Sequence, residues 1–210
     1  MRRWLKKWGY SWKRMRRSLK NQRDQELFEN AQSDLQHHHY QEDKKLIDVY
    51  YFDEMGINLI PSVPYGWQQK GERIELPSTR SRNQTVLGFM NKKLKFYPYL
   101  FEGAANTDVV IECFDRFVEH IEKETIVVLD NASIHRSNRF MDKQEEWKQK
   151  GLKLFFIPPY SPELNLIERL WKEIKYNWLK PQFIKTKKQL ENQLLYVLKN
   201  IGEKFTISFV

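Results

Sequence analysis

Residues 126–129 have the sequence Ile-Val-Val-Leu, and this unbroken apolar run constrains the fold more than any other feature. A run of this length, rich in β-branched residues, predicts a strand. Because every side chain in it is apolar, both faces of the strand need cover, which is typical of a sheet with helices on both sides. Residues 152–157 predict a further buried strand.

The segments around these strands alternate between strand and helix patterns. Upstream, β-forming residues separated by turn residues predict strands at residues 46–52, 57–60, 85–90 and 94–100. Apolar residues three to four positions apart predict helices at residues 108–122, 138–150, 163–179 and 188–201. This order indicates an α/β or α+β chain with a mixed sheet flanked by helices.

Length and composition suit one ordinary domain with an attachment. The chain has 210 residues, of which 40% are hydrophobic, so it can bury a real core. A single cysteine, Cys113, excludes an internal disulfide framework and a cysteine-based zinc module. No apolar run approaches the roughly 18 residues of a membrane span, and no apolar segment follows the charged N-terminus as in a secretory signal. We expect a soluble, cytoplasmic protein without a membrane partner.

The positive charge is concentrated at the N-terminus. The formal net charge is +9, yet residues 1–23 contain ten basic and no acidic residues, so the remainder is nearly neutral. Such a block is typical of a segment that binds a polyanion such as DNA, although a solvated basic tail is the alternative. The candidate DNA-binding residues in it are Arg2, Arg3, Lys6, Lys7, Lys13, Arg14, Arg16 and Arg17.

The basic arm also shows local structure. Apolar residues recur at helical spacing, namely Trp4, Trp8, Trp12, Met15 and Leu19. Gly9 could cap a short helix, which predicts helix over residues 1–8 and an irregular segment after it. Residues 24–35 predict a connecting helix, and the three histidines at 37–39 favour a solvated linker over a metal site.

Two acidic residues follow predicted strands. Asp53 comes directly after residues 46–52 and continues the face of Val49 and Tyr51, while Asp130 comes directly after residues 126–129. Acids at this position lie at the edge of a sheet, where open α/β folds place their sites. Burial makes such acids costly, so each needs a partner or a cation.

A third acid, Glu168, lies on the predicted helix 163–179. Ser161 and Pro162 are a favourable N-cap and first helical residue. The helix has an apolar stripe formed by Leu164, Ile167, Trp171, Ile174 and Trp178. At about 100° per residue Glu168 falls at the edge of that stripe, so it can point into a site while the helix remains packed.

Each acid has a structural alternative. Asp53 could cap a turn, with Asp48 as a competing candidate, Asp130 could belong to a turn, and Glu168 could pair with Lys172. Together, however, three acids without an adjacent base favour binding of a hard cation through oxygen ligands. Two Mg²⁺ or Mn²⁺ ions about 3.5–4 Å apart would suit phosphodiester cleavage.

Two segments carry a resemblance. Residues 128–135, VLDNASIH, and residues 158–171, PPYSPELNLIERLW, strongly resemble the mariner-type insertion-sequence transposases of the DDE superfamily. The match extends to residues 52–54 and more loosely to Trp67 and Arg80, and it covers about residues 44 to 200. The long second segment is the most specific part.

The resemblance implies a ribonuclease-H-like fold with a catalytic, metal-binding triad of Asp53, Asp130 and Glu168. It also implies two Mg²⁺ or Mn²⁺ ions, cleavage at transposon ends, and attack of the liberated 3′-hydroxyl on target DNA. The partners would be double-stranded DNA and a second copy of the chain, as a homodimer on paired ends. Residues 1–42 would then be a basic arm with a connecting helix, a remnant of a DNA-binding module, and residues 43–210 the catalytic domain.

Residues beside the acids leave alternatives open. Asn131 could bind a ligand or close the turn, and His135 could contact phosphate or support a carboxylate, or be an ordinary loop histidine. Trp67 could stack on a base or pack under a hairpin. Lys172 and Lys175 could follow the DNA backbone or solvate their helix.

Two departures from the family pattern bear on function. The family commonly has proline where Leu166 stands, which could alter the bend before Glu168. Family members usually carry complete helix-turn-helix modules, whereas only a basic fragment precedes this domain, as in a truncated or split reading frame. Another ribonuclease-H-like nuclease and an inactive DNA-binding remnant are therefore the alternative functions.

Overall fold

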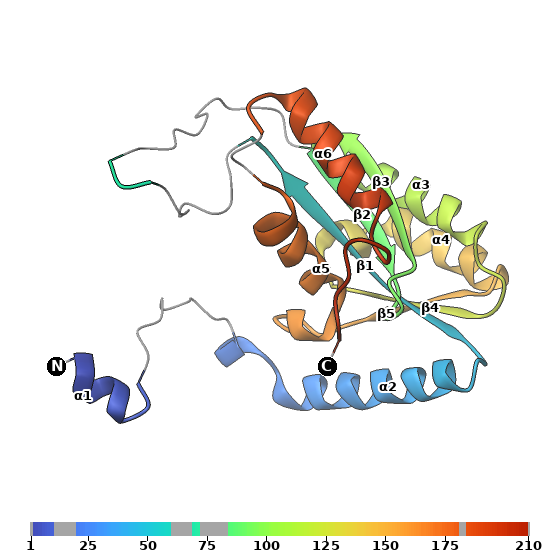
Figure 1. The fold of residues 1–210 in the computed structure, drawn as a ribbon. Coiled ribbons are helices and arrows are strands. Elements are labelled where there is room, and N and C mark those ends of the chain that lie inside the picture. Colours follow the sequence, from blue (N-terminus) through green and yellow to red (C-terminus); the bar gives the residue numbers. More distant parts are fainter. Residues whose placement is uncertain (1, 11–19, 60–68, 72–83, 181–183, 210) are drawn as a thin grey trace.

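A five-stranded mixed sheet with helices on both faces forms the body of the protein (Figure 1). The structure is a computed structural model that describes residues 2–10, 20–59, 69–71, 84–180 and 184–209. The strands are β1 (Asp48–Ile57), β2 (Gln84–Met90), β3 (Phe96–Glu102), β4 (Thr125–Leu129) and β5 (Leu152–Phe156). Their order is β3-β2-β1-β4-β5, in which β1 is antiparallel to β2 and parallel to β4. The expected mixed sheet is confirmed.

Two helical layers cover the sheet. The helices are α1 (Arg2–Lys7), α2 (Gln25–Asp43), α3 (Thr107–Val118), α4 (Asn138–Gln149), α5 (Ile167–Glu173) and α6 (Lys187–Lys199). One core lies under α3 and α4, where Phe114 and Trp147 pack on the sheet. The other lies under α2, α5 and α6, with Leu35, Leu170 and Leu194 buried in it. This accounts for the fully apolar run at residues 126–129, which is buried on both faces.

The first strand is longer than the sequence predicts. β1 continues through Asp53 to Ile57, so the separate strand at residues 57–60 is wrong, and Asp53 lies inside a strand rather than at its end. The physical reason is long-range pairing. The second half of β1 pairs with β2, where Asp53 faces Gly88, and these backbone hydrogen bonds extend the strand past its apolar part.

The three histidines at 37–39 belong to a helix, so the predicted linker there is wrong. α2 runs from Gln25 to Asp43 with Asp24 as its N-cap. The ring of His38 packs edge-on against Phe155, with centroids 5.4 Å apart. His39 is held by the hydroxyl of Tyr51, 2.7 Å from its Nε2. Contacts with the sheet thus extend the helix. The division of the chain into an arm, residues 1–42, and a catalytic domain, residues 43–210, stays a prediction.

The predicted helix 163–179 consists of three pieces. A 3-10 turn (η3, Pro162–Leu164) precedes α5, and a π-helical turn (η4, Ile174–Trp178) follows it. Asn165 separates the first two pieces because its backbone is extended, with φ −99° and ψ 100°. Ser161 therefore does not cap the helix, which begins at Ile167, so the predicted start was wrong.

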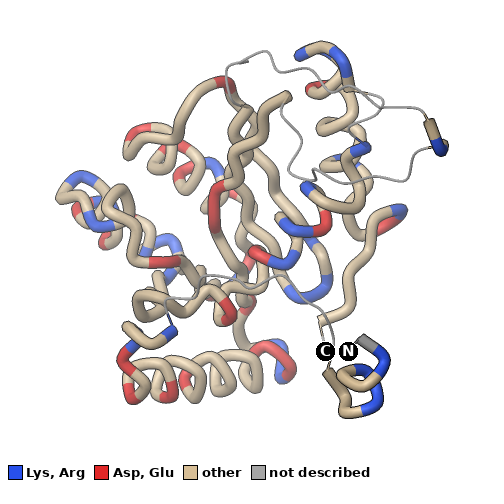
Figure 2. The backbone as a smooth tube through the Cα atoms, turned by 90° about the vertical axis from the view of Figure 1, so that its left-hand side faces the viewer, with Lys and Arg blue, Asp and Glu red and all other residues tan. Residues whose placement is uncertain are grey.

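The basic arm is described only in part. α1 lies outside the two helical layers (Figures 1 and 2). Its residues Arg3, Lys6 and Lys7 are exposed. Further along the chain, Lys20 and Arg23 both form ion pairs with Glu163, at 2.9 and 2.6 Å. The candidates outside the described residues are Trp12, Lys13, Arg14, Met15, Arg16, Arg17, Leu19, Trp67 and Arg80.

None of the helices in the described part of the chain is both long enough and apolar enough to cross a membrane.

Candidate active site

The pairing of β1 with β4 aligns Asp53 and Asp130. The parallel register runs from Asp48 with Thr125 to Tyr51 with Val128. Continuing this register by two residues puts Asp53 beside Asp130, just past the last pair. Neighbouring strands lie about 4.8 Å apart, so the two backbones that carry these acids are close. The acids therefore lie where β1 and β4 diverge, at the carboxyl end of the parallel part of the sheet.

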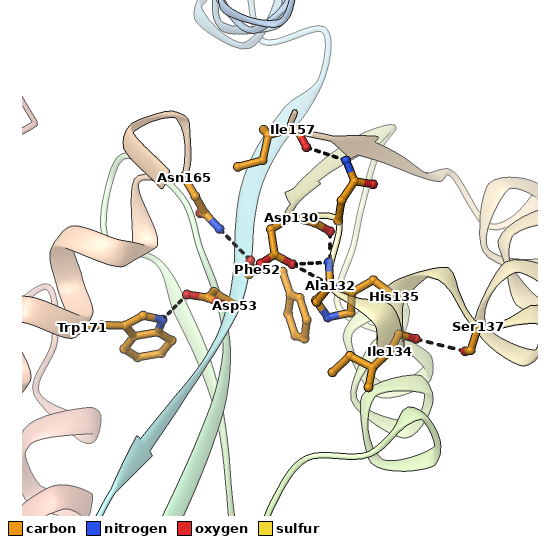
Figure 3. A network of polar contacts seen from close by, with 11 residues as sticks. Phe52, Asp53, Asp130, Ala132, Ile134, His135, Ser137, Ile157, Asn165 and Trp171 are labelled. Carbon is orange, nitrogen blue, oxygen red and sulfur yellow. Dashed lines mark hydrogen bonds and ion pairs between the residues drawn. The ribbon is translucent and has the colours of Figure 1, made fainter. Parts of the chain in front are cut away.

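Asp53 points toward the layer of α5. It follows Val49 and Tyr51 on the sheet face that packs under this helix, and the indole Nε1–H of Trp171 donates to its Oδ2 at 3.0 Å (Figure 3). Burial raises the pKa of Asp53 to about 7; the backbone N–H of Glu54 opposes the shift, and the charges of Glu168 and Asp130 add to it. The carboxyl group is therefore poised to lose its proton near neutral pH.

Asp130 has the opposite environment. About half of its side chain is exposed, and its Oδ1 accepts hydrogen bonds from Nδ1–H of His135 and the backbone N–H of Ala132, both at 3.0 Å (Figure 3). These donors favour the charged form, and the hydrogen bond from His135 contributes most to lowering the pKa of Asp130. Asp130 is thus already ionised at the near-neutral pH at which Asp53 loses its proton.

Glu168 is the second residue of α5 and is partly buried. In its first-turn position the positive end of the helix dipole favours a negative charge. Among the described residues no ion pair joins it to Lys172, the alternative partner in the sequence. Its charge reaches Asp53, since it contributes to the raised pKa there.

Two asparagines fasten the loops around the acids. Asn131 Nδ2 donates to the carbonyl oxygen of Ile157 at 2.8 Å, which joins the loop after β4 to the end of β5. Asn165 Nδ2 donates to the carbonyl oxygen of Phe52 at 3.0 Å, which joins the segment before α5 to the residue before Asp53 (Figure 3). The side-chain amide of Asn131 thus joins two neighbouring segments of the chain, and whether it also binds a ligand stays a prediction.

Sequence reasoning missed three residues of this site, Glu54, Asn165 and Trp171. Glu54 lies on the other face of β1, with a buried Oε2 that has no hydrogen-bond partner among the described residues; burial raises its pKa, and His135 opposes the shift. Asn165 is 4% exposed. At about 100° per residue Asn165 falls outside the apolar stripe of the predicted helix, so nothing local indicated its partner or that of Trp171.

A divalent cation fits the chemistry of this donor set. Asp53, Asp130 and Glu168 offer carboxylate oxygens, which suit Mg²⁺ and Mn²⁺. Burial is the main cause of the raised pKa of Asp53, and a cation would offset the smaller contribution from the charges of Glu168 and Asp130. Within the described ranges, no three His, Cys, Asp or Glu side chains stand close enough to form a ready-made metal site. Convergence of the three acids on one ion stays a prediction, and so do the roles of Asn131, His135, Lys172 and Lys175.

The fold has known counterparts. The catalytic domain of Mos1 mariner transposase superposes with a TM-score of 0.56 at 12% identity, over 90% of this chain and 85% of that one. A mariner Mos1 paired-end complex with Mg gives a TM-score of 0.65 at 15% identity, over 92% of this chain and 60% of that one. The mixed sheet between helices is thus the ribonuclease-H-like fold of transposase catalytic domains.

Sequence comparison gives the family. The model of the DDE superfamily endonuclease domain matches residues 48–191. An insertion element IS630 uncharacterized 39 kDa protein of Shigella sonnei is 24% identical over 180 residues, which are 83% of this chain and 50% of that protein. The chain belongs to the DDE superfamily, as an IS630/mariner-like transposase catalytic domain. It spans about half the length of that curated relative.

Proposed function

We propose that this chain catalyses DNA transposition. It cleaves phosphodiester bonds at the ends of a mobile element by hydrolysis and then joins each liberated 3′-hydroxyl to target DNA, displacing a 3′-oxygen of the target strand. The alignment of Asp53 with Asp130 on adjacent parallel strands, with Glu168 held on the helix that contacts β1, is the observation that carries this proposal.

The protein's own groups give each acid a distinct part. His135 and Ala132 hold Asp130 ionised, so it offers a permanent negative charge to a cation. Asp53 has a pKa of about 7 in the metal-free chain, and a cation bound there would displace its proton. Bound Mg²⁺ or Mn²⁺ would supply the acidified water and the neutralisation of the leaving oxygen that hydrolysis of DNA needs. Glu168 completes the oxygen donor set.

DNA is the partner that the charge distribution supports. The arm residues Arg3, Lys6 and Lys7 are exposed on α1, and Lys172 is exposed on the helix that carries Glu168. Phosphate contacts by such residues provide affinity without sequence information. The Mos1 paired-end complex motivates the further proposal that two copies of this chain act on two element ends.

A nicking assay tests the proposal. The substrate is a supercoiled plasmid that carries the DNA flanking both ends of the coding sequence, with Mg²⁺ or Mn²⁺ added. Wild-type protein should cut near the boundaries of the element. Asp130→Asn should lose more than the factor of about 100 that loss of a group supporting a metal ligand typically costs.

Asp142→Asn is the matched control, because this acid is exposed on α4, away from the site, and should leave cleavage unchanged. Cleavage of RNA–DNA hybrids without preference for the element ends would favour a general ribonuclease-H-like nuclease instead. DNA binding with no cleavage in either metal would show an inactive DNA-binding remnant.

A further inference from the structure

One indole connects Asp53 with the helix that carries Glu168. Trp171 lies in α5 and is 3% exposed, and its Nε1–H donates to Oδ2 of Asp53 at 3.0 Å (Figure 3). A buried ring has little freedom to move, so this hydrogen bond sets the direction in which the carboxylate points. Hydrogen bonds of this kind orient metal ligands and tune their basicity.

Gly88 makes room for this indole. It pairs with Asp53 across β1 and β2, and a Cβ at this position would lie 3.0 Å from Cη2 of Trp171 and 2.5 Å from Cε2 of Phe96. Phe96 itself packs edge-on against Trp171, with ring centroids 5.9 Å apart. A side chain at position 88 must therefore displace the ring of Phe96, and the indole of Trp171 must also give way slightly. The missing Cβ allows the indole to lie beside Asp53.

The same helix is anchored a second time to β1. Asn165, just before α5, donates to the carbonyl oxygen of Phe52, while Trp171 donates to the side chain of the next residue. Glu168 lies between these two anchors, one helical turn before Trp171. The contacts that orient Asp53 therefore also set the place of Glu168 relative to β1.

We propose that Trp171, seated against Gly88, is a positioning residue that aims the Asp53 carboxylate at a shared cation and keeps α5, with Glu168, at the matching distance. The proposal rests on the proposed function, because it concerns the same cation. It assigns to the indole N–H a role in metal binding that is separate from its role as a buried ring.

The test measures Mn²⁺ binding to the metal-free protein, for example through the EPR signal of free Mn²⁺, together with the melting temperature. Trp171→Phe keeps a buried ring and removes the donor, and it should raise the Kd for Mn²⁺ about 10-fold to 100-fold. Trp147→Phe is the matched control, since this fully buried indole donates to Asp115 at 2.7 Å in the other helical layer. It should lower the melting temperature similarly and leave the Kd unchanged.

Gly88→Ala provides a second, independent variant. It should also weaken Mn²⁺ binding, and the double variant with Trp171→Phe should lose less than the two single losses combined, because both act through one hydrogen bond. If Trp171→Phe does not fold, wild-type affinity in Gly88→Ala overturns the proposal.

Mn²⁺ affinity distinguishes failure of the positioning role from failure of the proposed function. Wild-type Mn²⁺ affinity in Trp171→Phe, with binding lost in Asp130→Asn, overturns the positioning role and leaves the proposed function standing. Equal shifts in Trp147→Phe and Trp171→Phe would reduce Trp171 to a packing residue. If wild type binds Mn²⁺ no better than Asp130→Asn, the proposed function falls, and the positioning role with it.

Discussion

At the scale of single residues, the two aspartates differ because their surroundings differ. Asp53 is enclosed between β1 and α5, where desolvation disfavours its charge, and Asp130 sits in a half-exposed loop that supplies two hydrogen-bond donors. The same carboxylic acid therefore has a raised pKa in one position and a lowered pKa in the other. Without a cation, ionised Asp53 costs folding free energy.

This cost predicts a pH-dependent stability of the metal-free protein. An ordinary aspartate has a pKa of 3.8, whereas Asp53 in the folded chain has a pKa of about 7. Between these values the folded state retains a proton that the unfolded state has lost, so the free energy of unfolding falls as pH rises toward 7 and then levels off. Urea denaturation in EDTA across this range should show a shallower fall for Asp53→Asn than for wild type.

The comparison isolates one group because other titrating residues are shared by both proteins. Asp142→Asn, which removes an exposed acid, should keep the wild-type slope. Parallel curves for wild type and Asp53→Asn would show that Asp53 is not desolvated in the folded protein.

At the scale of elements, the segment before α5 is shaped by Asn165. Its extended backbone ends η3 and lets its side chain reach the carbonyl oxygen of Phe52, after which the chain resumes as a helix. Leu166 is the N-cap of this helix, with φ −63° and ψ −25°. That φ is the one that a proline ring imposes, and extended backbone is what proline favours in the residue before it.

Leu166→Pro should therefore be tolerated. The N–H of Leu166 has no hydrogen-bond partner in the described part of the chain, so proline removes no bond there. We expect the free energy of unfolding to remain within about 1 kcal/mol of wild type, because the stiffer unfolded chain offsets the loss of leucine packing. Thermal or urea denaturation measures it.

Leu170→Pro is the contrasting variant, since a proline inside α5 should cost about 3 kcal/mol or more. Equal losses of unfolding free energy in the two variants would mean that the backbone at Leu166 does not have a conformation that suits proline.

At the scale of the whole molecule, the excess positive charge and the three candidate acids are in different parts of the chain. Most of the positive excess precedes α2, whereas Asp53 lies in β1, Asp130 just past β4 and Glu168 in α5. The two parts are joined at Glu163, which pairs with Lys20 and Arg23 next to the segment that leads to Glu168. These two basic residues are engaged within the protein, so the residues before them are the better candidates for phosphate contacts.

Removing residues 1–19 should weaken binding to duplex DNA and flatten its salt dependence. Each phosphate neutralised contributes about 0.9 to the slope of log K against log salt, so the slope should fall by the number of contacts that the arm makes. Fluorescence anisotropy at several salt concentrations measures it. A full-length variant in which glutamine replaces the eight basic residues of the arm should behave like the deletion. These residues are Arg2, Arg3, Lys6, Lys7, Lys13, Arg14, Arg16 and Arg17.

An unchanged slope in both proteins would assign the DNA contacts to the body. A lower slope in the deletion alone would mean that the arm acts through its length or its apolar residues rather than through its charge.

Local sequence patterns predicted the layered fold and singled out the three acids. The apolar run at residues 126–129 and the helical periodicity from residue 108 onward are local signals, because covering both faces of a strand or one face of a helix requires apolar residues at fixed spacings. The 77 positions between Asp53 and Asp130 match the register of β1 and β4. That register, however, could be seen only once the strands were paired.

Tertiary structure decided the rest. The second half of β1, the histidines of α2 and the break at Asn165 all depend on partners distant in the chain, such as β2, Phe155 and Phe52. Local patterns carry no record of such partners, because a hydrogen bond or a missing Cβ has meaning only when another segment lies within a few ångströms. The pairing of Trp171 with Asp53 is of this kind.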